Sequence, residues 1–541
     1  MKQNIIKKIA ALSIALTFFN QSCTNLDEEI YSDVTADNFF KTNEEFISAL
    51  GQAYASLGGL GNHSNLWSVQ EISSDELVIT TKGGDWYDGG VLIQLHQHNW
   101  TIDNGFFNNT WQFLYGGINN CNRLIYQFGQ SDAPQATAFI NELRALRALW
   151  YYWLLDSFGN VPLVVDFKET SPVGNSTRAQ VFAFVESELN AVINNLPTDV
   201  SAVTYGRMTK WTAHAIKCKL YLNAEVYTGT AKWTEAAAEA QAIISSGKYN
   251  LESSYKDNFS INNAGSTENI FVYPYDKVFA GGFNWPMMTL HYASQGVYKL
   301  TAQPWNGYSV VEEFYNSYID PAQNPGPQGP VWKGLTSDLN GDGISDDNGT
   351  VDSRLSNFVV GPQFNPDGTR ASDPGFEGPT TAAPDPDGAP LTFTPQINQI
   401  YPNGWRQGGA RIGKYQYEVG GTNNMSNDFV VFRYADILLS RAEALWRLNS
   451  GSAEALTLVN QIRTRAGVTA YGSLTADNLV AERGREMFAE MTRRQDLIRF
   501  DKWGSTWWEK PVSTATYKLF PIPKAQRDVN SLLQQNPGYP N

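Results

Sequence analysis

Residues 432–467 constrain the fold most, because their pattern predicts two helices joined by a tight turn. Gly451 suits a helix C-terminus, and Ser452 is an N-cap candidate for the second helix. Such a hairpin cannot bury its apolar face alone and must stack on neighbouring helices. The apolar positions at helical spacing are Ala435, Leu438, Leu439, Ala442, Leu445 and Trp446, then Ala455, Leu458, Val459 and Ile462.

Residues 211–247 repeat this design. An Ala-Glu pair at 224–225 precedes Glu235 by 11 residues, and the pair at 442–443 precedes Glu454 by 12. Two such hairpins predict a mostly α-helical fold in which tetratricopeptide-like helical pairs form a scaffold. Further amphipathic helices are expected over residues 33–57, 106–128, 139–156, 177–196 and 478–500.

Charge and aromatic content narrow the function. The formal net charge is −14, which argues against nucleic acid and against adsorption to anionic lipid, since both need a basic surface. The chain holds 16 Trp, 26 Tyr and 28 Phe residues. Because so many rings cannot all lie in the core of a polar chain, some of them should be exposed for binding.

The N-terminus resembles a bacterial lipoprotein signal. Lys2, Lys7 and Lys8 precede an apolar run over residues 9–19 that is too short to span a membrane. Ser22 then precedes Cys23, which would be acylated and become the first residue of the mature protein. Residues 1–22 are therefore expected to be a signal peptide, with Cys23 as the only membrane anchor. The alternative is an ordinary signal peptide with an incidental cysteine.

Between residues 259 and 428 the chain is rich in Gly, Pro, Asn and Asp, which predicts long loops. Exposed aromatic rings on such loops could stack on the C–H face of a sugar, with polar groups binding its hydroxyls. Each ring could instead belong to the core. The glycan-binding candidates are Trp67, Trp86 and Tyr87 in a first glycine-rich loop and Trp285, Tyr292, Trp305, Asn306 and Tyr308 in a second. Their possible polar partners are Asp85, Asp88, Asn284 and Gln303.

Residues 338–347 follow the D-x-N-x-D-G pattern of a calcium loop, with Asp338, Asn340, Asp342 and Asp346 as the expected ligands. Gly349 stands where an EF-hand needs a bidentate Glu, so a solvated turn is the alternative. No other cofactor is expected.

Catalytic patterns are weak. Glu482, Glu486 and Glu490 share a helical face and could be proposed as catalytic carboxylates, but nearby arginines favour a salt-bridged helix. None of the five histidines has metal-ligand or triad spacing, and Cys121 and Cys218 fit buried thiols. We therefore expect a protein that is not an enzyme.

Several stretches, taken together and in order, resemble the SusD/RagB family of outer-membrane glycan-binding lipoproteins, which includes starch-binding members. These stretches are residues 142–151, 158–163, 207–211, 433–444, 482–486, 494–497, 519–523 and 535–539. The resemblance implies a SusD-like fold, a scaffold of helical pairs with a loop-rich lobe that contains short strands. It divides the chain into a SusD-like N-terminal region over 23–255 and a RagB/SusD C-terminal region over 256–541.

The resemblance also implies a non-catalytic role at the cell surface. Such proteins are lipid-anchored in the outer membrane, face the exterior, capture oligosaccharides and deliver them to a SusC-type TonB-dependent transporter. Two alternatives stay open: a glycoside hydrolase acting on the same polysaccharide, and a structural helical-repeat adaptor.

Overall fold

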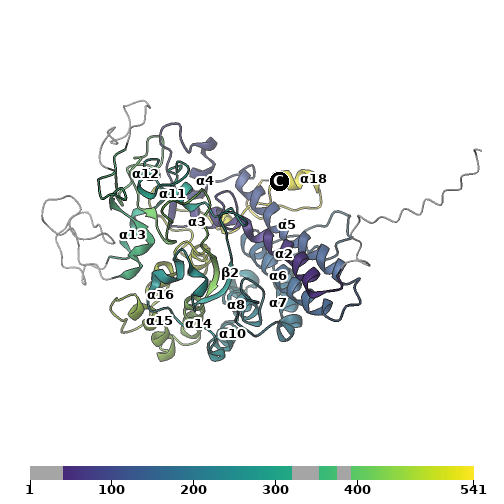
Figure 1. The fold of residues 1–541 in the computed structure, drawn as a ribbon. Coiled ribbons are helices and arrows are strands. Elements are labelled where there is room, and N and C mark those ends of the chain that lie inside the picture. Colours follow the sequence, from purple (N-terminus) through teal and green to yellow (C-terminus); the bar gives the residue numbers. More distant parts are fainter. Residues whose placement is uncertain (1–39, 320–351, 374–390, 541) are drawn as a thin grey trace, which may run out of the picture.

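The computed structural model describes residues 40–319, 352–373 and 391–540, drawn in colour in Figure 1. Its α-helices are α2 (Asn43–Ala55), α3 (Leu66–Ile72), α4 (Val91–Gln97), α5 (Gly105–Phe128), α6 (Ala136–Ser157), α7 (Arg178–Val192), α8 (Lys210–Leu222), α9 (Ala224–Thr228), α10 (Trp233–Ser246), α11 (Trp285–Thr289), α12 (Ser294–Tyr298), α13 (Glu312–Asn316), α14 (Tyr434–Leu448), α15 (Ala453–Arg465), α16 (Ala476–Met487), α17 (Arg493–Arg499) and α18 (Lys524–Val529). Short 3-10 helices are η2 (Ser56–Gly59), η3 (Asp88–Gly90), η4 (Ile193–Asn195), η5 (Tyr255–Phe259), η6 (Asn263–Gly265), η7 (Ser353–Asn357) and η8 (Ala515–Lys518).

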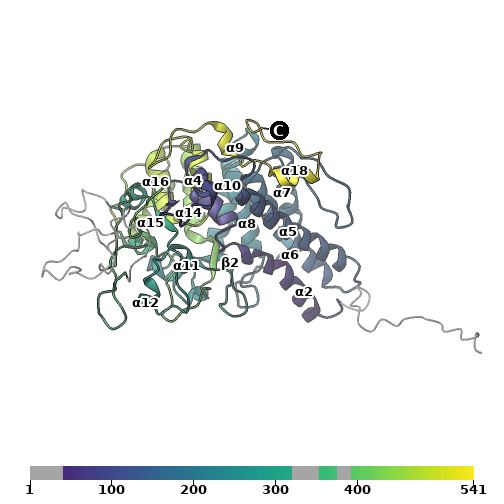
Figure 2. The same cartoon turned by 90° about the horizontal axis from the view of Figure 1, so that it is seen from above.

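The two predicted hairpins form and stack on each other. Residues 211–247 fold as α8 and α10 with the short α9 between them, and residues 432–467 fold as α14 and α15. Helix α10 packs against both α8 and α14, which buries the apolar stripes of both hairpins. In Figures 1 and 2, α2, α5 and α6 lie on one side of the molecule, and α11 and α12 lie on the other.

Several helix starts follow from local sequence. Thr42, Thr177, Thr209 and Thr475 each form a capping box with the residue three positions later, which satisfies two backbone N–H groups at the helix start. Residues 148–155 are apolar on every face of α6 and are all buried. That run places α6 at the centre of the helical side, between α5 and α7.

One expected helix is broken. The predicted helix over 478–500 consists of α16 and α17, separated by Phe488–Thr492. Ala489 and Met491 have φ values of 58° and 56°, in the left-handed region that a helix cannot use. The backbone N–H of Ala489 donates to Glu76 and that of Met491 to Glu71, so distant carboxyl groups hold this corner. Those partners lie more than 400 residues away, beyond the reach of local periodicity.

In the described residues, strands form four two-stranded antiparallel sheets: β1 (Leu77–Ile79) with β3 (Tyr308–Val310), β2 (Asn269–Tyr273) with β8 (Phe429–Arg433), β4 (Phe358–Val359) with β7 (Arg411–Ile412), and β5 (Gly361–Pro362) with β6 (Thr392–Phe393). Pairing of Val78 with Ser309 brings the segment that follows β1 beside the segment that precedes β3. Within the coloured part of the chain, no helix has the length and apolar character needed to cross a membrane.

Candidate glycan-binding site

The first segment of the site is the tight loop that follows β1, over residues 80–90. Lys82 and Asp85 exchange backbone hydrogen bonds of 3.0 and 3.4 Å, which closes the turn. Trp86 and Asp88 have φ values of 60° and 44° although neither is glycine. Each such residue costs about 1–3 kcal/mol and is retained where the surrounding structure fixes it, commonly at binding sites.

The second segment, residues 285–308, meets this loop. The Trp86 Nε1–H donates to the carbonyl oxygen of Trp305 at 2.6 Å, and the Tyr292 hydroxyl donates to the Asp85 carboxylate. Burial, followed by the bond to Asp85, raises the pKa of Tyr292, so its hydroxyl keeps its proton at neutral pH. The two aromatic loops predicted from sequence therefore contact each other.

A third segment, residues 400–406, was missed at the sequence level. Backbone hydrogen bonds join Thr81 to Ile400 and Gly404, both at 2.8 Å, and Gly83 to Pro402 at 3.0 Å. They bring the Tyr401 ring to 5.4 Å from the Tyr87 ring, centroid to centroid, with the planes tilted by 38°. The run Tyr401-Pro402-Asn403-Gly404-Trp405 has the same glycine-rich aromatic composition as the other loops, and that was the available signal.

We call Trp86, Tyr87, Tyr292, Trp305 and Tyr401 the aromatic platform. Tyr87 is 44 % exposed and Tyr401 is 50 % exposed, and the other three rings are half-buried. His63 packs edge-on against Trp305 at 5.2 Å and adds a polar ring beside it. Burial lowers the pKa of His63, so this ring is neutral at pH 7 and can serve as donor or acceptor. Adjacent open ring faces with polar neighbours suit a sugar chain.

Four of the predicted glycan contacts are wrong. Trp67, Trp285, Asn306 and Tyr308 are fully buried, and a ring without exposed surface cannot stack on a sugar. Trp285 is enclosed by four rings, those of Trp67, Phe283, Tyr415 and Phe429.

These buried residues support the platform from below. Trp67 packs on Trp285 at 4.6 Å and on Tyr308 at 5.6 Å. Tyr308 in turn meets the Trp86 ring edge-on at 6.0 Å. For Trp67, Trp285 and Tyr308, the alternative that the ring belongs to the core is therefore correct.

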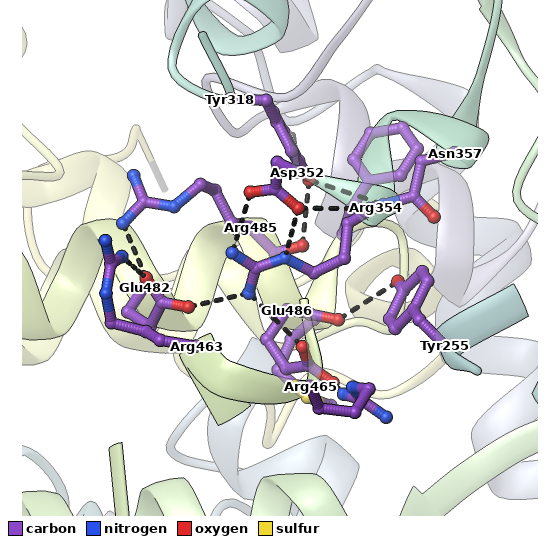
Figure 3. Close-up of polar contacts among 12 residues, drawn as sticks. Tyr255, Tyr318, Asp352, Arg354, Asn357, Arg463, Arg465, Glu482, Arg485 and Glu486 are labelled. Carbon is purple, nitrogen blue, oxygen red and sulfur yellow. Dashed lines mark hydrogen bonds and ion pairs between the residues drawn. The ribbon is translucent and has the colours of Figure 1, made fainter. Parts of the chain in front are cut away.

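Glu482 and Glu486 belong to a buried ionic network, not to a catalytic pair (Figure 3), and Glu490 joins this network through Lys414 and Arg433. Burial alone would raise the pKa of Glu482, but Arg354, Arg485 and Arg463 together hold it well below the ordinary value. The salt-bridged interpretation is confirmed, although most partners come from distant segments. The network comprises Glu268, Asp352, Arg354, Lys414, Arg433, Arg463, Arg465, Glu482, Arg485, Glu486 and Glu490.

Comparison with known proteins places the chain in a family. A model described as the SusD family matches residues 267–539, half of the chain. The chain belongs to the SusD family. A second model, described as starch-binding and associating with the outer membrane, matches residues 26–222.

Two curated SusD-type relatives cover most of the chain. The starch-binding protein SusD of Bacteroides thetaiotaomicron is 25 % identical over 509 residues, which cover 89 % of this chain and 86 % of that protein. SusD-like protein P2 of Formosa agariphila is 24 % identical and covers 99 % of this chain and 100 % of its own length.

Among solved structures, surface glycan-binding protein A of Bacteroides thetaiotaomicron with laminarihexaose superposes with a TM-score of 0.68 at 21 % identity. It covers 92 % of this chain and 100 % of that one. The predicted mostly helical SusD-like fold is confirmed.

SusD family membership also bears on catalysis and location. Members of the family are binding proteins, so the non-catalytic prediction is confirmed. Association with the outer membrane is confirmed at that coarse level. The lipid anchor at Cys23 stays a prediction, because Cys23 lies outside the described residues.

We assign neither the predicted metal ligands nor the two buried cysteines to this candidate site. The predicted calcium ligands Asp338, Asn340, Asp342 and Asp346 also lie outside the described residues and stay a prediction. In residues 40–319, 352–373 and 391–540, no group of three or more His, Cys, Asp or Glu side chains could hold a metal ion. Burial raises the pKa of Cys121 and Cys218 to about 12, so both are unreactive thiols.

Proposed function

We propose that this SusD family protein captures an oligosaccharide on the aromatic platform and passes it, unaltered, to a SusC-type TonB-dependent transporter. The observation that carries the proposal is the pair of open rings, Tyr87 and Tyr401, set on a fixed three-segment base. Their centroids lie 5.4 Å apart with the ring planes tilted by 38°, so the two rings form one continuous aromatic surface. The names of the relatives, starch-binding SusD and a laminarin-binding SusD-like protein, support a glycan as the ligand.

The physical basis of binding is the removal of apolar surface from water on both partners. A sugar ring covers a phenol or indole face with its C–H groups while its hydroxyls remain hydrogen-bonded at the edges. The tyrosines at the open surface are fixed by loops that are already folded, so little ordering entropy is lost when a sugar binds. Asp88 is exposed beside Tyr87 and can accept hydrogen bonds from hydroxyl groups.

Affinity electrophoresis on starch and laminarin gels tests the site. Tyr87→Ala and Tyr401→Ala should each weaken retardation by at least tenfold in Kd, about 1.4 kcal/mol, and the double variant should abolish it. Phe279→Ala is the matched control, because Phe279 is 92 % exposed but lies outside the platform. Wild-type retardation in the double variant would contradict the proposed site.

Two further measurements separate the alternatives. A glycoside hydrolase would release reducing sugar from the retained polysaccharide, whereas the proposed protein leaves it intact. A structural adaptor would bind neither polysaccharide.

The proposal also includes a lipid anchor at Cys23 and delivery of the glycan to the transporter. Cys23→Ala should move the protein from the membrane fraction to the soluble fraction, because acyl chains would supply its attachment. Co-purification of a transporter with the acylated wild type would support the partner, and a wild type that purifies alone under the same mild detergent would count against it.

A further inference from the structure

Lys82 lies beneath the aromatic platform, where all three of its segments meet. Its side chain is 2 % exposed, and its ammonium group donates to the carbonyl oxygens of Thr80 at 3.2 Å and Gly307 at 3.4 Å. Its backbone N–H closes the turn to Asp85, and its backbone pairs with Asn403. Lys82 belongs to the loop after β1 and thus contacts both the segment before β3 and residues 400–406.

The contact with Gly307 matters because this glycine sits against the Trp86 ring. A Cβ atom at position 307 would come within 2.5 Å of the indole, so the backbone here sets the ring position. The neighbouring Trp305 carbonyl accepts the Trp86 Nε1–H. Through Gly307, the Lys82 ammonium therefore fixes the distance between the two loops that carry the half-buried indoles.

We propose that Lys82 is the positioning residue of the platform and that its ammonium proton is required for tight glycan binding. This inference rests on the proposed function. Lys82 would not touch the sugar; it would act by holding the rings that do.

The surroundings of Lys82 make its proton easy to lose. Burial, then the nearby Arg411 guanidinium, lowers the pKa of Lys82 well below the ordinary lysine value, and Arg406 adds to this while Asp85 opposes it. Arg411 reaches the region from β7, Arg406 from the 400–406 segment and Asp85 from the turn itself. A neutral amine still donates hydrogen bonds, but they are roughly half as strong as those of an ammonium group.

Binding of laminarin and soluble starch, measured from pH 5 to pH 9, tests this role. Wild-type affinity should fall about fivefold to tenfold as the pH rises across this range. Lys82→Met should bind about tenfold more weakly at pH 5 and show no such fall. Lys82→Arg should retain binding at pH 9, since its guanidinium stays charged.

Lys510→Met is the matched control. Burial lowers the pKa of Lys510 to about 8, so this lysine loses its proton within the tested pH range, but it packs on Trp507 and not on the platform. The alkaline loss of binding should persist in this variant.

Two results would overturn the inference alone: Lys82→Met with wild-type affinity at pH 5, or a wild type whose affinity is constant from pH 5 to pH 9 while its circular dichroism is unchanged. A wild type that binds neither polysaccharide at pH 5 would overturn the proposed function as well.

Discussion

The aromatic platform and the buried ionic network are held together by different interactions. The platform joins its three segments by backbone hydrogen bonds and ring contacts, and it keeps Tyr87 and Tyr401 open to water. The network joins distant segments by charge, and the guanidinium groups of Arg354 and Arg433 are fully buried within it.

This difference separates binding from stability. Removing one partner of a buried ion pair leaves a charge without compensation and is strongly destabilising, so the network makes the fold sensitive to the loss of a single charge. The platform carries strained backbone at Trp86 and Asp88, which the surrounding structure can hold in place. We therefore expect changes in the network to lower stability and changes in the platform to lower affinity.

Breaking the network should give the largest effect. Arg433 donates to Glu268 at 3.1 Å, Glu486 at 2.6 Å and Glu490 at 2.8 Å. Arg433→Met would remove a cation that three buried carboxylates share, which leaves them Lys414, Arg465 and Arg354 as cationic partners. It should lower the free energy of unfolding by about 3–5 kcal/mol in urea denaturation. Polysaccharide affinity of the folded variant should stay at the wild-type level.

Lys524→Met provides the comparison for this loss. Lys524 pairs with Asp528 at 2.6 Å, but both side chains are exposed, so no change in Tm is expected. If Arg433→Met proved as stable as Lys524→Met, the ionic network would not contribute to stability as we propose.

A second change addresses Glu71 and Glu76, which join α3 and β1 to the corner between α16 and α17. One oxygen of each accepts a backbone N–H, from Met491 and Ala489. The two carboxyl groups also contact each other, and no donor in the described chain reaches Glu71 Oε2 or Glu76 Oε1. Two ionised carboxylates would leave both of these buried oxygens charged and without a donor, so we expect the pair to hold one proton. Burial raises the pKa of Glu71 to about 7 and that of Glu76 well above its ordinary value.

Because the folded state holds this proton more tightly than the unfolded chain, wild-type stability should fall as pH rises from the ordinary Glu value of 4.5 to about 7. Glu71→Gln keeps a donor toward Glu76 but does not titrate, so it should remove about 2–3 kcal/mol of this fall. Denaturation series at pH 5 and pH 7 measure the difference. Glu44→Gln, at an exposed position of α2, should leave the slope unchanged, and equal slopes in all three proteins would refute the shared proton.

A third change acts on the platform. Gly307→Ala would place a Cβ atom within 2.5 Å of the Trp86 indole and push that ring outward. We expect about tenfold weaker polysaccharide binding and a loss of roughly 1–3 kcal/mol in stability from overpacking. In the same loop as Trp86, Gly84 has no atom within 4 Å of its hypothetical Cβ, so Gly84→Ala should bind as the wild type does. Similar binding by both variants would show that the indole position is unimportant.

Much of the helical fold was predictable from the sequence because it depends on short-range periodicity. Local patterns predict the helical hairpins over 211–247 and 432–467 and the uniformly apolar stretch in α6. They also predict salt bridges for Glu482 and Glu486; Arg485 is a local partner of Glu482, whereas Arg354 and Arg433 come from distant segments. The break between α16 and α17 did not, because Glu71 and Glu76 impose it from the other end of the chain. Tyr401 was missed because its role depends on pairing with Tyr87.

The sequence by itself determined the helical pairs, the family and the presence of aromatic residues on glycine-rich stretches. Only the tertiary structure decided which of those rings meet water. Trp86 and Trp285 stand in similar local sequences, yet Phe283, Tyr415 and Phe429 enclose Trp285 while the platform loops leave Trp86 half-buried. Exposure is a property of contacts between distant segments, and local composition carries no record of those contacts.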